Sequence, residues 1–216
     1  MSARDNILAR IRSGLGLPGT AVGAERAQFA EYIARNPRGP RPSFDTTDLV
    51  ARFCERSVKL GSTVERVASL AEVPQAVARY LTTSALPVTG VVWPALQALS
   101  WQEAGLSFQA REANGLDLVG VTGAFCAIAE TGTLMLLSAA ETPATVSLLP
   151  ETHIAVLAAA RIVAGMEEAW ALMASEREGL PRAVNFVSGP SRTADIEQTI
   201  VIGAHGPYRV HVVCHG

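Results

Sequence analysis

Apolar positions near the N-terminus recur at helical spacing, and a break in the pattern follows them. The recurring residues are Ile7, Leu8, Ile11 and Leu15. This spacing is typical of one face of an amphipathic helix. A second helical pattern covers residues 25–35 and ends at the Pro-, Gly- and Arg-rich stretch 36–42, which has the composition of a linker. We therefore expect an N-terminal helical arm over residues 1–42 and a main domain over 43–216.

In the main domain, amphipathic stretches alternate with short apolar runs rich in β-branched residues. The amphipathic stretches predict helices over 45–59, 74–84 and 165–178. The apolar runs predict strands over 62–67, 88–93, 106–111, 125–129, 133–138, 153–157, 183–188, 200–203 and 208–214. Such alternation is typical of an α/β fold, so we expect a mixed, largely parallel sheet flanked by helices.

Two places in this pattern need separate interpretation. The runs 125–129 and 133–138 are joined by a Glu-Thr-Gly turn, so we expect them to form a hairpin, which adds an antiparallel pair. The segment 116–129 is mixed. Its residues 120–123, with a glycine at each end, are typical of the lead into a turn.

Composition and charge exclude several classes of protein. Of the 216 residues, 49% are apolar, which is enough for a sizeable core, and the net charge of −2 gives no basic excess for nucleic acid. The single lysine, Lys59, is not part of a Gly-x-x-x-x-Gly-Lys phosphate loop. No apolar run approaches the ~20 residues of a membrane span, and the N-terminus lacks an apolar leader pattern. We expect a cytoplasmic protein that binds neither nucleic acid nor a membrane.

Cysteines and histidines give no expectation of a metal site. Cys54, Cys126 and Cys214 are far apart and form no Cys-x-x-Cys pair, so neither a zinc ribbon nor an iron–sulfur cluster is expected in this chain. Free cysteines suit a reduced compartment. His211 and His215 fall on one face of a predicted strand, about 13 Å apart at about 3.3 Å per residue. That separation is too long for two ligands of one metal.

Candidate chemistry lies in turns that follow the apolar runs, because open α/β sheets gather ligand sites at strand ends. Glu130 follows such a run, and a carboxylate held there can act as a base, as a nucleophile toward an acyl group or as an acceptor for a ligand hydroxyl. The alternative is that Glu130 caps backbone N–H groups of the hairpin. Thr131 and Thr133 add hydroxyls, and Gly132 leaves room either for a ligand or for a left-handed turn.

A second stretch, residues 188–197, combines polar residue types that no core requires. Its candidate ligand-binding residues are Ser188, Gly189, Ser191, Arg192, Thr193 and Asp195. Residues 188–191 stand at the end of a predicted strand. A short helix could begin at Thr193, and its free N–H groups together with Arg192 would then bind a carboxylate or a phosphate. The alternative is a capped strand-to-helix turn in which Arg192 pairs with Asp195 or Glu197.

Two histidines lie near these turns. His205 stands between Gly203 and Gly206 in a turn with little to pack, and it is a candidate catalytic acid, base or hydrogen-bond donor near neutral pH. Gly206 is counted with the ligand-binding residues. His153 opens a predicted strand after Pro150 and is a further candidate for ligand binding. Either histidine could equally be a structural residue.

Four motifs lie in order along the chain, at residues 129–133, 147–154, 188–197 and 203–207. Their order, spacing and residue types resemble the LUD-domain family of lactate-utilization proteins, in its small lactate utilization protein C (LutC/YkgG) branch, over residues 116–213. The resemblance implies a core similar to glucosamine-phosphate deaminase, ribose-phosphate isomerase and CoA transferases (the NagB/RpiA/CoA-transferase-like fold). CoA transferases attack the acyl group with the glutamate of a Glu-x-Gly motif, to which Glu130-Thr131-Gly132 is similar.

The same resemblance implies iron–sulfur partner subunits. Proteins of this branch are encoded with an iron–sulfur subunit pair, and the three are required together to oxidise L-lactate to pyruvate. The clusters would lie in the partners, and this chain would bind no cofactor. One departure from the family is that residues 139–143 carry no arginine, so Arg192 would have to carry the positive charge here.

Three functions remain open on these grounds. The first is a component of a lactate-oxidation system that binds a small carboxylate, acyl or phosphate group through the candidate residues. The second is an assembly subunit without catalysis, docking on iron–sulfur partners through residues 1–42. The third is an independent CoA transferase or sugar-phosphate isomerase. Whether the chain is itself an enzyme stays open, and the amphipathic N-terminal helix makes a homo-oligomer possible.

Overall fold

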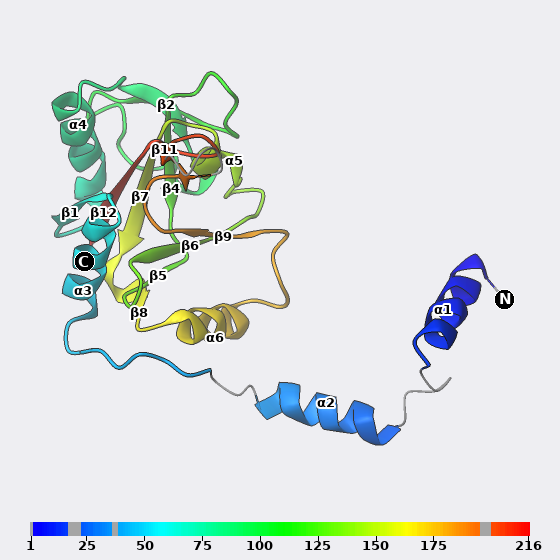
Figure 1. Ribbon diagram of the computed structural model, residues 1–216. Helices are drawn as coiled ribbons and strands as arrows, with labels where there is room; N and C mark the ends of the chain where they lie inside the picture. Colours follow the sequence, from blue (N-terminus) through cyan, green and yellow to red (C-terminus); the bar gives the residue numbers. More distant parts are fainter. Residues whose placement is uncertain (1, 17–22, 36–38, 195–199) are drawn as a thin grey trace. The chain divides into compact units, whose positions relative to one another are not determined.

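The computed structural model describes most of the chain, and the described residues fall into two units (Figure 1). The described ranges are 2–16, 23–35, 39–194 and 200–216. By their internal contacts the units are Met1–Ser43 and Phe44–Gly216. No helix within the described ranges is both long enough and apolar enough to cross a bilayer.

The N-terminal unit contains the two predicted helices, α1 (Ala3–Gly14) and α2 (Gly23–Arg35). Helix α1 begins with a capping box, in which the Ser2 hydroxyl accepts from the Asp5 amide and the Asp5 carboxylate accepts from the Ser2 amide. All residues of α1 are exposed, and so are residues 26–35 of α2. Burial within this unit therefore does not hold either helix in place.

The second unit is built on a central sheet whose strands are all parallel. Its strands are β1 (Thr63–Val67), β2 (Thr89–Val92), β3 (Ser107–Ala110), β4 (Val119–Gly123), β7 (Thr152–Ala158) and β12 (Arg209–His215). They lie in the order β1-β12-β7-β4-β2-β3. Strands β4 and β7 are buried along nearly their whole length, as is typical of a parallel sheet covered on both faces. The prediction of an α/β fold with a largely parallel sheet is confirmed.

A second sheet holds the predicted hairpin. It consists of β8 (Ile162–Val163), β5 (Cys126–Ile128), β6 (Thr133–Leu137) and β9 (Val184–Val187), in that order. Strands β5 and β6 pair antiparallel, which confirms the hairpin, and β9 pairs antiparallel with β6. The hairpin thus belongs to a separate sheet and does not extend the parallel one. A short ladder joins β10 (Arg192–Thr193) to β11 (Val201–Ile202).

Helices and the second sheet cover the faces of the central sheet in layers. The helices of this unit are α3 (Leu49–Lys59), α4 (Val73–Thr83), α5 (Thr145–Leu148) and α6 (Met166–Glu176), with 3-10 turns at Leu70–Glu72, Pro94–Leu96 and Ala159–Arg161. One buried cluster joins α4 to one face of the central sheet. Another joins the opposite face to α3, α5 and the second sheet. A third lies between the second sheet and α6, which Figure 1 shows beside β5 and β8.

Several predicted boundaries are wrong, each for a local reason. The helix expected from residue 45 begins at Leu49, because Asp48 caps the Ala51 amide and Asp45 instead accepts from the Thr47 amide. The turn expected over residues 120–123 is the buried strand β4. Helix α5 and strand β8 carry too few residues to show a period, and neither was predicted.

Candidate functional site

A row of hydroxyl groups joins two of the motifs singled out from the sequence. Thr131 Oγ1 lies 2.7 Å from Thr133 Oγ1, which lies 2.6 Å from Ser188 Oγ. The pairing of β6 with β9 places these residues together, since Leu134 is opposite Val187 and the preceding and following residues therefore meet. The structure thus brings the turn after β5 and the end of β9 to one place, although they lie far apart in the sequence.

Glu130 precedes Thr131, the first residue of this row, in the sequence. Its residue is half-buried, and its backbone N–H donates to the Ala164 carbonyl at 3.0 Å. Within the described ranges no hydrogen bond or ion pair involves the Glu130 carboxylate. The alternative in which this side chain caps hairpin amides is therefore not what the structure shows, and the carboxylate remains available to a ligand.

Gly132 serves the turn and lies against helix α3. Its φ is +71°, a value that favours glycine. A Cβ at this position would lie 2.7 Å from the Ser57 backbone nitrogen and 2.8 Å from the Arg56 carbonyl carbon. The Ser57 hydroxyl also donates to the Gly132 carbonyl. Of the two roles expected for Gly132, the left-handed turn is present, and helix backbone fills the space beside it.

The loop after β9 is held by the connection between α3 and β1. Gly189 has φ +83°, and a Cβ there would lie 2.6 Å from the Leu60 carbonyl oxygen. That same oxygen accepts a hydrogen bond from Arg192 Nη2 at 2.9 Å. Arg192 is exposed, and this bond uses one of the five N–H donors of a guanidinium. Leu60 was not found from the sequence, because its role rests on a main-chain carbonyl that any residue type supplies.

The predicted anion cradle is only partly open. The Ser191 amide donates to the Pro207 carbonyl at 2.9 Å and so is engaged. The short helix expected from Thr193 is wrong at its first residue, because Thr193 lies in β10 and pairs with Val201 of β11. Asp195 lies outside the described residues. Among the described residues, the remaining capacity for an anion rests on the Ser188 hydroxyl and on the donors of Arg192 other than the one bonded to Leu60.

The loop that carries His205 lies beside this one. His205 is exposed, and a Cβ on Gly206 would lie 3.4 Å from Ser191 Cβ. Gly206 leads through Pro207 into β12, and Leu60 leads into β1. The two loops therefore meet at the amino ends of β1 and β12, whereas ligand sites of open α/β sheets gather at the carboxyl ends.

His153 lies inside the central sheet, away from solvent. It is fully buried in β7, and its Nε2 lies 2.8 Å from Thr122 Oγ1 of β4. Burial lowers the pKa of His153 to about 4, so the imidazole is neutral at pH 7. This hydrogen bond is to the sheet and to none of the other candidate residues, which is the arrangement of a structural histidine.

His211 is buried in a similar way. Its Nδ1 lies 2.8 Å from Thr63 Oγ1, and its ring stacks on Tyr80 at 3.9 Å. Burial lowers the pKa of His211 to about 4. No group of three or more His, Cys, Asp or Glu side chains able to hold a metal lies within the part of the chain that the structure describes.

Sequence relatives match the region that carries these motifs. A model of the LUD domain family matches residues 94–214. A protein from Exiguobacterium sp. named lactate utilization protein C is 42% identical over 98 residues, 44% of this chain and 43% of the relative. A protein of the same name from Geobacillus thermodenitrificans is 36% identical over 121 residues, 54% of this chain and 50% of the relative. The chain thus spans half or less of the length of these curated relatives.

One solved structure is similar over most of the chain. It is the crystal structure of a DUF162 family protein from Deinococcus radiodurans, with a TM-score of 0.62 and 27% sequence identity. The match covers 81% of this chain and 100% of that one. The layered arrangement of the second unit is therefore shared with a protein whose fold is known from experiment.

Proposed function

Because this chain belongs to the LUD-domain family, we propose that it is a component of an L-lactate utilization system and binds a small anionic ligand. In the proposed system L-lactate is oxidised to pyruvate together with iron–sulfur partner subunits, and the clusters lie in those partners. The names of the relatives in Exiguobacterium and Geobacillus support the assignment to lactate utilization. The partners and the ligand are part of the proposal.

Two observations carry the ligand site. The hydroxyls of Thr131, Thr133 and Ser188 form one row, and Glu130, the residue before Thr131, has a carboxylate that no described residue bonds. A 2-hydroxy acid offers a hydroxyl that donates to a carboxylate and a carboxylate that accepts from hydroxyls and a guanidinium. In the proposed site Glu130 accepts the hydroxyl hydrogen or takes up a proton. Arg192 and Ser188 bind the ligand carboxylate, and His205 is a hydrogen-bonding partner on the neighbouring loop.

We expect Glu130→Gln to abolish the function without unfolding the protein. Glutamine keeps the size of the side chain but removes its charge and its capacity as a base. The measurement is growth on L-lactate of a host that lacks this gene, complemented by wild type, by Glu130→Gln or by Glu178→Gln, an exposed carboxylate outside the site. Wild type and Glu178→Gln should restore growth, and Glu130→Gln should not.

Two other outcomes of this experiment would contradict the proposed function. Growth with Glu130→Gln would favour the assembly role, for which the exposed apolar side chains of Phe29, Tyr32 and Ile33 on α2 are the supporting observation. Normal growth of the uncomplemented host would contradict a role in lactate utilization.

We expect Arg192→Ala to weaken anion binding by about tenfold or more, since a hydrogen bond to a charged group contributes about 1.5–3 kcal/mol. The probes are L-lactate and inorganic phosphate, and calorimetry measures their affinities. Arg192 is exposed, and the packing of Gly189 against Leu60 does not involve its side chain, so circular dichroism should be unchanged. Arg182→Ala, another exposed arginine, is the matched control. Equal affinities for wild type and Arg192→Ala would remove Arg192 from the site.

A further inference from the structure

Among the described strands, the central sheet ends in one that is paired on one side only. In the order β1-β12-β7-β4-β2-β3, strand β3 pairs with β2 on one side and stands at the edge. The Ser107 amide donates to the Val88 carbonyl, which places the main-chain groups of Ser107 and Gln109 toward β2. In a parallel ladder the intervening residues face the other way. The N–H and C=O groups of Phe108 and Ala110 therefore point outward, and no described residue outside the sheet hydrogen-bonds to them.

This edge lacks most of the features that protect edge strands. Ser107, Gln109 and Ala110 are exposed. Proteins protect such edges with charged side chains, proline, bulges or very short strands. Strand β3 has neither a charge nor a proline, and it pairs with β2 in an unbroken register. Only its length of 4 residues limits pairing with another chain.

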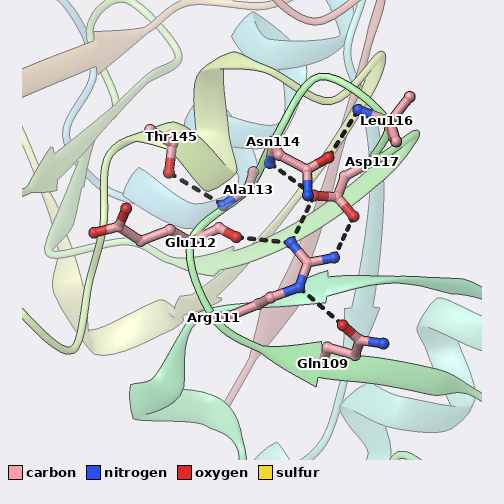
Figure 2. A network of polar contacts seen from close by, with 8 residues as sticks. All are labelled: Gln109, Arg111, Glu112, Ala113, Asn114, Leu116, Asp117 and Thr145. Carbon is pink, nitrogen blue, oxygen red and sulfur yellow. Dashed lines mark hydrogen bonds and ion pairs between the residues drawn. The ribbon is translucent and has the colours of Figure 1, made fainter.

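A polar pocket of about 330 Å³ lies on the face of β3 formed by Ser107 and Gln109. Arg111 closes it through two bonds of 2.7 Å to the Asp117 carboxylate, and Arg111 Nε donates to the Gln109 amide oxygen at 2.8 Å. Figure 2 shows this oxygen turned toward Arg111 and the amide nitrogen turned away. Because the charges of Arg111 and Asp117 cancel and Gln109 keeps donors to offer, the pocket suits an uncharged polar side chain.

The turn that follows β3 is held firmly around this pocket. Three backbone N–H groups of the turn donate to side chains (Figure 2). That of Asn114 donates to the Asp117 carboxylate, that of Leu116 to the Asn114 side-chain oxygen, and that of Ala113 to the Thr145 hydroxyl. Leu116 lines the pocket and is 90% exposed. A hydrogen-bonded turn thus holds the wall of the pocket in place, including the exposed side chain of Leu116.

A second pocket, of about 320 Å³, lies on the opposite face of the same strand, where Phe108 forms part of its wall. Phe108 packs edge-on against Trp101, with ring centroids 5.4 Å apart. Glu103 is the charged residue among its described lining residues. The wall is otherwise mostly polar, with Gln97, Ser100 and Gln102 beside the ring of Phe108. A wall of this kind with one carboxylate suits a lysine or arginine, whose stem contacts the ring while the charged end meets the carboxylate.

Consecutive side chains of a strand point to opposite faces of a sheet. A strand added beside β3 therefore places neighbouring side chains over the two pockets in turn. We propose that the edge of β3 binds an extended peptide segment of a partner protein as an additional strand. An uncharged polar side chain of the segment enters the Gln109–Arg111 pocket, and an adjacent basic side chain enters the Trp101–Phe108 pocket. This edge is distinct from the proposed ligand site and does not depend on it.

A second copy of this chain fits the edge less well. Antiparallel pairing of two β3 strands would bring Ser107–Ala110 of each copy together, and that segment contains no basic residue for Glu103. Arg111, which follows the segment, is already bonded to Asp117 of its own copy. A different segment is therefore required to fill both pockets. Strand addition of this kind combines main-chain hydrogen bonds, which give affinity, with side-chain pockets, which give specificity.

The test is selection of a random eight-residue peptide display library on the full-length chain. Enriched peptides are synthesised, and their affinities are measured by fluorescence anisotropy with wild type, Ala110→Pro and Ala110→Ser. Proline removes the outward N–H of Ala110 and keeps the bonds to β2, as edge strands tolerate. Serine keeps that N–H. We expect enrichment of a Ser, Thr, Asn or Gln next to a Lys or Arg, binding weakened about tenfold or more in Ala110→Pro, and no change in Ala110→Ser.

Two further measurements do not depend on the folding of Ala110→Pro. Binding should slow hydrogen exchange of the Phe108 and Ala110 amides in the wild-type chain, and Glu103→Gln should weaken peptides that carry the basic residue. Absence of enrichment, equal binding to Ala110→Pro and Ala110→Ser, or unchanged exchange at both amides would overturn the proposal. So would sedimentation that finds a dimer for wild type and a monomer for Ala110→Pro, because a second copy would then occupy the edge.

Discussion

Replacing Gly120 by alanine is expected to lower the free energy of unfolding by about 3 kcal/mol, which is large for the addition of one methyl group. A Cβ at this position in β4 would lie 2.2 Å from the Val146 carbonyl oxygen and 2.8 Å from Pro150 Cγ. Both neighbours belong to the segment around α5 that packs on the sheet, and neither is the flexible end of a side chain. Helix α5 would have to move away from β4, which opens the core between the central and second sheets.

Chemical denaturation followed by circular dichroism and tryptophan fluorescence measures this effect. The matched control is Gly115→Ala, since a Cβ at Gly115 meets nothing within 4 Å and Gly115 has no positive φ. The control should stay within about 0.5 kcal/mol of wild type. Equal stabilities of Gly120→Ala and Gly115→Ala would mean that α5 does not pack on β4 in solution.

Stability should also fall steeply when the pH is lowered from 6.5 to 4. The pKa values of His153 and His211 are each lowered to about 4 by burial. In the unfolded chain a histidine has a pKa of about 6.5. Between these values the unfolded state binds protons that the folded state does not, so the free energy of unfolding falls as the pH falls. Each histidine contributes about 1.4 kcal/mol per pH unit, and about 3 kcal/mol over the whole interval.

The measurement is the midpoint of urea unfolding at pH values from 7.5 to 4.5. The interval from 6.5 to 5 separates the histidines from most carboxyl groups, which titrate lower. His153→Gln and His211→Gln should each reduce the slope by up to one proton, even if they lower stability at pH 7. A stability that is flat from pH 7 to 5 in the wild type would show that both imidazoles reach solvent.

The sequence predicts the strands well because their apolar runs have the length and the flanking turns of buried strands. The hairpin around Glu130 is one example, since a Glu-Thr-Gly turn between two such runs leaves little alternative. It could not be assigned to a separate sheet, because strand partners are set by packing between distant segments. At Gly120 the local prediction itself was wrong. Its glycine suggested a turn, but it allows α5 to approach a central strand, and α5 is too short to be predicted by periodicity.

For the candidate residues too, the sequence predicted the chemical groups but not the contacts between them. Thr131, Thr133 and Ser188 were chosen as separate polar residues in turns, and the structure joins them in one row. The bond between His153 and Thr122 could not be anticipated, because it depends on which strand lies beside β7. The helix expected from Thr193 is wrong at that residue, because Thr193 pairs with Val201 in a strand ladder. Local sequence thus indicates chemical groups, and tertiary pairing decides which of them meet.

Both loops of the proposed site pack against one segment, which consists of helix α3 and the residue after it, Leu60. Gly132 packs against Ser57 of the helix and accepts a hydrogen bond from its hydroxyl. The Leu60 carbonyl contacts Gly189 and accepts a hydrogen bond from Arg192. The distance between the Glu130 turn and the Ser188 loop is therefore set before any ligand arrives. In the proposed site, a ligand that touches both loops would therefore lose little free energy in ordering them, which matters most for a ligand that forms few hydrogen bonds.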